Sequence, residues 1–145
     1  MKNNKQTEKD LFRYAERKLY DYKYIEDKID IINFKLNDIS ITAVDYSKDK
    51  LSPTNAFSSA VENEVIRREE KLAALQAEKK QLLYEKALIE KVLKLLTPTE
   101  LEIVQLRYLG EKNDVISIRD KLCISNDTYN RYKNNAINKI KEYLI

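Results

Sequence analysis

The chain has very few residues that end a helix. Gly110 is its single glycine, and Pro53 and Pro98 are its only prolines, in 145 residues. Glycine and proline are the residues that interrupt helices most strongly, so the sequence leaves few places to turn. Charged side chains make up 35% of the chain and alternate with apolar residues at helical spacing, which is typical of largely helical proteins. We therefore predict an all-α fold.

The last 49 residues contain three helix starts. Thr97 can cap a first helix, because Pro98 suits its first turn and Glu100 completes a capping box. Asp114 and Ser125 are the caps of two further helices, and only Cys123-Ile124 separates the second helix from the third cap. A short helix, a tight turn and a longer helix are the layout of a helix-turn-helix. The residues predicted to face inward are Leu101, Val104, Tyr108, Val115, Ile118, Leu122, Tyr129, Tyr132, Ala136, Ile137 and Ile140.

Two long amphipathic segments precede this module. They run from about Thr7 to Ile39 and from about Ala56 to Leu96, and their apolar residues largely follow heptad spacing. The polar stretch 40–55 between them is long enough to let the second helix fold back on the first. We therefore predict a long antiparallel, coiled-coil-like hairpin over residues 1–96, with a loop near 40–55, for dimerisation or partner docking. Residues 97–145 form the second predicted domain and could fold alone, although their core is near the lower size limit.

Short motifs connect the chain with known regulators. Segments 102–108, 118–125 and 136–140 resemble the promoter-reading C-terminal region of bacterial sigma factors. Segments 19–23, 52–55 and 61–65 are similar to phage-encoded regulators of the ArpU/RinA type, which place a helical segment ahead of a sigma-like helix-turn-helix. Two residues depart from the sigma pattern. Arg119 stands where a small alanine is usual, and Cys123 stands where a turn glycine is usual and would need an unusual backbone or a looser turn.

This resemblance implies a sequence-specific regulator of transcription that binds double-stranded DNA and controls phage late genes. It places Asn126, Asp127 and Arg131 at base-reading positions. The chemistry agrees, because asparagine can pair with adenine and arginine with guanine in the major groove. Against it, an AT-rich genome encodes asparagine everywhere, and a helical bundle without a nucleic-acid role would show the same caps. The predicted DNA-binding residues are Ser125, Asn126, Asp127, Thr128, Asn130, Arg131, Lys133, Asn134 and Lys139, the last as a phosphate contact.

Charge and surface pattern bear on the partners. The net charge is +3, and residues 97–145 carry only +1, so we expect weak non-specific DNA binding, with the remaining affinity coming from base contacts, dimerisation or a protein partner. Leu83, Leu88 and Val92 lie off the heptad seam and favour a homodimer, although a simple spacer would also explain the hairpin. Two other functions stay open: a sigma-like adaptor that binds RNA polymerase without reading DNA, and a small DNA-recognising subunit of a phage terminase.

Nothing in the sequence favours an enzyme. The chain has no histidine, one cysteine and no glycine-rich phosphate loop, so the usual general base is missing, as are a Cys/His zinc site and an internal disulfide. We therefore expect no catalytic residues, metal, cofactor or small-molecule substrate. No apolar run approaches the ~20 residues of a membrane span, so the expected location is the cytoplasm of a bacterial host, with no membrane contact.

Overall fold

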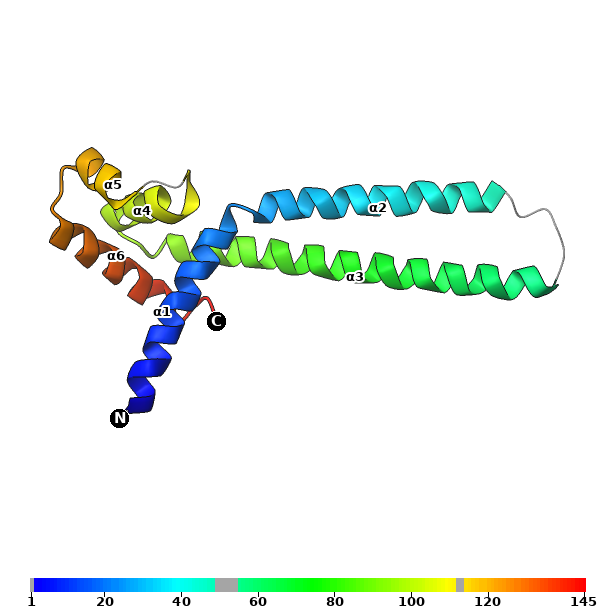
Figure 1. Ribbon diagram of the computed structural model, residues 1–145, viewed down its shortest axis with the longest axis horizontal. Coiled ribbons are helices and arrows are strands. Elements are labelled where there is room, and N and C mark those ends of the chain that lie inside the picture. The colour runs from blue at the N-terminus through cyan, green and yellow to red at the C-terminus, as the bar shows by residue number, and fades with distance from the viewer. Residues whose placement is uncertain (1, 49–54, 112–113) are drawn as a thin grey trace. The chain divides into compact units, whose positions relative to one another are not determined.

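A computed structural model describes residues 2–48, 55–111 and 114–145, and every regular element in these ranges is a helix (Figure 1). The all-α prediction is confirmed, with a helical hairpin followed by a helical C-terminal module. The chain divides into two compact units, one formed by Met1–Ile25 and Glu85–Ile145 and the other by Glu26–Tyr84. The elements are α1 (Lys2–Tyr22), α2 (Ile25–Lys48), α3 (Asn55–Leu93), α4 (Pro98–Val104), the π-helix η1 (Gln105–Leu109), α5 (Val115–Leu122) and α6 (Asn126–Ile140).

The first predicted helix is broken in two. We expected one helix from about Thr7 to Ile39, but α1 ends at Tyr22 and α2 begins at Ile25. The amide of Tyr24 donates to the carbonyl of Asp21 at 3.0 Å and closes the turn between them. Neither glycine nor proline marks this break, and the apolar spacing continues through it. The predicted loop also starts too early, because α2 continues to Lys48; residues 49–54 lie outside the described ranges.

The unit Glu26–Tyr84 is the helical hairpin of α2 and most of α3. Ile32 on α2 and Leu75 on α3 are its buried apolar side chains within the described part of the unit. Asp38 of α2 and Arg68 of α3 line one shallow groove, which places the two helices side by side. One face of each helix is therefore used to form the hairpin, and the opposite faces are left to solvent.

The other unit has a core to which all its helices contribute. Ile103, Ile118 and Tyr129 form one buried cluster of this core, one each from α4, α5 and α6. Partly buried Leu106, Val115, Leu122, Ile124 and Tyr132 pack around them. Side chains from outside the predicted module are buried in the same unit: Ala15, Leu19, Ile25, Ile89, Val92 and Leu96. The expectation that residues 97–145 enclose their own core therefore needs revision, because α1 and the end of α3 supply part of it.

The three predicted helix caps are confirmed. Thr97 accepts the amide of Glu100 at 3.4 Å, and the Glu100 carboxylate accepts the amide of Thr97 at 3.1 Å, which completes the capping box. Asp114 caps α5 through the amide of Ser117 at 2.7 Å, and Ser125 caps α6 in the same way. Each cap satisfies an amide that the first turn of a helix leaves without a partner. The sequence therefore placed these helix starts correctly.

Candidate nucleic-acid interface

A three-residue turn joins α5 to α6. Cys123 occupies the left-handed region, with φ 53° and ψ 45°. Its amide donates to Asp120 at 3.3 Å, and the next amide, of Ile124, donates to Arg119 at 3.1 Å. This is the unusual backbone that a cysteine in place of the turn glycine requires. The side chain raises the energy of this conformation by about 1–2 kcal/mol, and the turn nevertheless brings α6 directly against α5.

Arg119 does not prevent the two helices from packing. Its side chain is half-buried, while the adjacent Ile118 is fully buried against Tyr129 of α6. Among the described residues, no hydrogen-bond partner is found for Arg119 Nε or for the hydroxyl of Tyr129. The α5–α6 contact therefore forms with the bulky Arg119 side chain half-buried beside it.

Helix α6 has one apolar side and one amide-rich side. Tyr129, Ala136, Ile137 and Ile140 are buried against the rest of the unit. On the opposite side, four exposed residues at spacings of four, three and four form one face, which we call the α6 outer face. These residues are Asp127, Arg131, Asn134 and Asn138.

Three of the nine predicted DNA-binding residues, Asp127, Arg131 and Asn134, lie on this face. Asn126 is exposed in the first turn, and Asn130 is half-buried at the edge. Ser125 and Thr128 bond to each other through their hydroxyls at 2.9 Å and hold the start of the helix. The guanidinium of Arg131 lies 5.4 Å from the ring centre of Tyr132, which holds the cation close to the helix surface.

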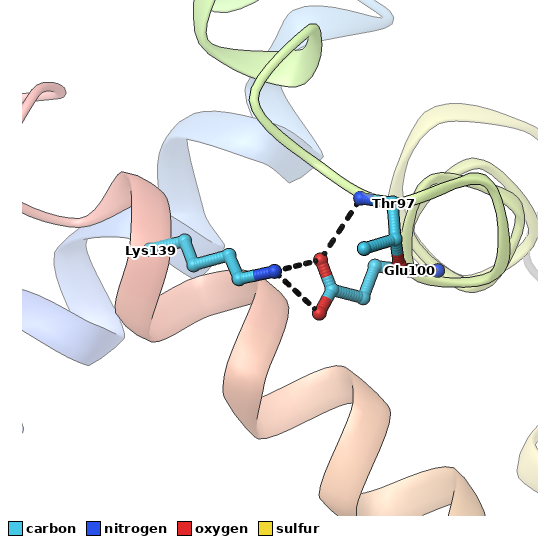
Figure 2. Close-up of polar contacts among 3 residues, drawn as sticks. All are labelled: Thr97, Glu100 and Lys139. Atoms are coloured by element: carbon cyan, nitrogen blue, oxygen red, sulfur yellow. Dashed lines mark hydrogen bonds and ion pairs between the residues drawn. The ribbon is translucent and has the colours of Figure 1, made fainter.

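The two lysines of the predicted set are engaged elsewhere. Lys139 Nζ lies 2.8 Å from each carboxylate oxygen of Glu100 (Figure 2). Lys133 Nζ lies 4.0 Å from Glu16 Oε1 on α1. The sequence assigned Lys139 to DNA phosphate, but its ammonium already pairs with the buried carboxylate of Glu100, so we do not retain Lys139 as a phosphate contact.

Glu100 ties α4 to α6. It is 4% exposed and is the one buried charged residue of the described part of the chain. Burial by itself would raise the pKa of its carboxyl group. Hydrogen bonds from Lys139 and Thr97, together with the charge of Lys139, outweigh that effect and hold the pKa below its ordinary value of 4.5. The carboxylate therefore completes the cap of α4 and anchors α6 at the same time.

A second polar contact ties α1 to the module. Tyr108 is buried within the π-helix, and its hydroxyl donates to Glu16 Oε1 at 2.6 Å. Its ring meets that of Tyr20 edge-on, with 4.8 Å between the ring centres. Burial, together with the hydrogen bond to Glu16, raises the pKa of Tyr108 well above its ordinary value. The spacing of apolar residues predicted that Tyr108 is buried, but nothing in the sequence pointed to Glu16 as its partner.

The π-helix ends at Gly110. The amide of Gly110 donates to the carbonyl of Gln105 at 3.0 Å, which is the five-residue step that defines a π-helix. Its φ of −96° is open to any residue, so the helix does not end through the left-handed conformation that glycine favours. A side chain here would instead have its Cβ 3.3 Å from the carbonyl oxygen of Gln105. Glycine is therefore favoured at position 110 because the carbonyl oxygen of Gln105 lies so close to it.

The start of α5 is poorly suited to bind DNA phosphate. The Asp114 carboxylate already accepts the Ser117 amide there, and a carboxylate at this end repels a second anion. The outer face of α6 is thus the better candidate for contact with a nucleic acid.

The chain belongs to the DUF722 family, described as proteins of unknown function, whose family model matches residues 17–142. Comparisons with curated proteins and with solved structures found no match. The matched range includes most of α1, the hairpin and all of α4, η1, α5 and α6. No helix in the described ranges is long and apolar enough to cross a membrane.

Proposed function

We propose that this protein is a sequence-specific regulator of transcription that binds double-stranded DNA, with α6 in the major groove. Phage late genes are the proposed targets, on the resemblance to ArpU/RinA-type regulators. The observation that carries the proposal is the α6 outer face. It is a continuous row of exposed side chains that can hydrogen-bond to base edges, on the second helix of a tight helix-turn-helix. This is the helix that reads base edges in DNA-binding proteins of this architecture.

The chemistry of the face favours base contacts over phosphate contacts. Asn134 and Asn138 carry amides that can pair with adenine, and Arg131 can pair with guanine. Lys133 and Lys139 each lie beside a carboxylate, so they add little positive charge to this surface. We infer that discrimination between sequences is strong relative to the non-specific attraction, which depends on cations facing phosphates.

The test begins by recovering the preferred DNA from a random-sequence pool with the full chain. Arg131→Ala is then expected to weaken binding to the recovered site by about 1–3 kcal/mol and to relax the preference at one base pair. Lys121→Ala is the control, because this exposed lysine lies on α5 outside the α6 outer face. Affinities are measured by fluorescence anisotropy at two salt concentrations.

Three outcomes contradict parts of the proposal. If no DNA is enriched, and the chain instead binds RNA polymerase, it is an adaptor. If Arg131→Ala binds the recovered site as the wild type does, α6 is not the reading helix. If the chain forms rings on DNA, the packaging subunit of a terminase becomes the better assignment.

A further inference from the structure

Helix α3 carries a row of exposed side chains on the side that faces away from α2. Its inward side holds Leu72, Leu75 and Leu82, which are buried or half-buried. The outward row is spaced by seven, four and seven residues, which places it along one line of the helix. It consists of Ile66, Ala73, Ala77 and Tyr84, all exposed, and Ile66 and Tyr84 expose 51% and 62% of their surface. We call this row the α3 outer row.

We propose that the α3 outer row is the surface through which two copies of this chain pair, with α3 antiparallel to α3 of the second copy. The two-fold axis passes at the level of residue 75. Residues equally distant from that level on either side then face each other. Ile66 meets Tyr84 of the other copy, and Ala73 meets its Ala77. Both copies thus contribute the same surface to the contact, as two-fold symmetry requires.

The sizes of the side chains fit this arrangement. Ala73 and Ala77 lie nearest the axis, where small side chains let two helix backbones approach closely. Ile66 and Tyr84 lie at the two ends, where each large apolar group covers the other. The pairing removes from water Ile66 and Tyr84, the two largest exposed apolar side chains of the row. Burial of apolar surface is the main source of stability for such contacts.

The charges select the antiparallel direction. Glu70 and Lys80 are both exposed, and they too are equally distant from residue 75. In the antiparallel pair Glu70 of each copy faces Lys80 of the other. A parallel pair would place Glu70 beside Glu70 and Lys80 beside Lys80, which is unfavourable. The row is therefore self-complementary in charge as well as in size.

The outer side of α2 is not self-complementary in charge. Ile31 and Phe34 are exposed there, and the exposed residues of that side include the acids Asp27 and Asp30. Two copies of that surface would bring carboxylates together. The residues that the sequence favoured for dimerisation do not belong to the α3 outer row. Val92 is only 4% exposed and lies in the other unit, and Leu83 lies to one side of the row.

The first experiment measures the mass of the full chain by sedimentation equilibrium from one to one hundred micromolar, without DNA. We expect a monomer–dimer equilibrium in the wild type. Ala77→Glu is expected to weaken dimerisation by about a hundredfold or more, because each dimer would hold two buried, unpaired carboxylates against alanine. Phe34→Glu is the matched control on the outer side of α2 and should leave the equilibrium unchanged.

A charge exchange tests the register. Glu70→Lys and Lys80→Glu should each weaken dimerisation by about tenfold, because two facing pairs become like-charged. The double variant restores both pairs in reverse and should return close to the wild type, with circular dichroism verifying that each variant is helical. A wild type that stays monomeric, a double variant weaker than both single variants, or a dimer lost only in Phe34→Glu would each overturn the proposal. DNA binding has no part in these outcomes.

Discussion

The two units of the molecule differ in how many apolar side chains they bury. Among the described side chains, every buried apolar residue except Ile32 and Leu75 lies in Met1–Ile25 or Glu85–Ile145. The hairpin unit exposes 76% of Phe34 and 55% of Ile31 instead. A pair of helices can hide only one face of each, whereas several crossing helices can enclose a centre. The first unit is thus organised around its own core, and the hairpin leaves apolar side chains exposed to solvent.

The strongest test of this contrast is a pair of truncations, one in each unit. Leu19→Ala removes a fully buried side chain of α1, and we expect it to lower the free energy of unfolding by about 2–5 kcal/mol. Ile31→Ala removes a similar side chain from the exposed surface of α2 and should change it by less than about 0.5 kcal/mol. Urea unfolding followed by circular dichroism measures both. Equal losses would show that the two units do not differ in this way.

A second test compares an ion pair from each unit. Lys139→Ala leaves the buried carboxylate of Glu100 without its cation, so we expect a loss of about 1–3 kcal/mol at neutral pH. Glu64→Ala breaks the pair with Arg68, which spans one helical turn at 3.5 Å on the hairpin. That pair is worth less than about 0.5 kcal/mol. Similar losses from both changes would mean that the burial of Glu100 does not matter to its pairing.

The pH dependence of the same variant follows from the lowered pKa of Glu100. A carboxyl group whose pKa is lower in the folded chain stabilises the fold above its ordinary value of 4.5, and this contribution is lost as the pH falls below it. Without Lys139 the buried carboxyl group is no longer favoured in its charged form. The stability difference between wild type and Lys139→Ala should therefore shrink as the pH falls from 6 to 3. A constant difference would contradict this account.

The smallest expected effect concerns the backbone at Cys123. Glycine tolerates the left-handed conformation without a side-chain clash, although it adds freedom to the unfolded chain. Cys123→Gly is therefore expected to stabilise the protein by about 0.5–1 kcal/mol, seen as a higher Tm. Cys123→Ala keeps the Cβ atom, so it should bring no such gain and provides the control. A gain from alanine equal to that from glycine would place the effect in the thiol group and not in the backbone.

Local signals in the sequence predicted local structure well. Thr97, Asp114 and Ser125 were identified as caps because a cap depends on a residue and its neighbours three positions ahead. Helical spacing identified Ile118 and Ile137 as buried for the same reason. The break between α1 and α2 left no such signal, because residues 23–24 include neither glycine nor proline and the apolar spacing runs on. The π-helix before Gly110 was missed as well, since the spacing of apolar residues is too coarse to distinguish it.

The sequence by itself determined that the chain is helical, where α4, α5 and α6 begin, and which side of α6 faces outward. These properties depend on interactions within one or two helical turns. Only the tertiary structure decided that α1 joins the C-terminal unit through Leu19 and the bond from Tyr108 to Glu16. It also decided that Lys139 pairs with Glu100. Each of these contacts joins residues far apart in the chain, and many other partners of the same chemistry were available to them.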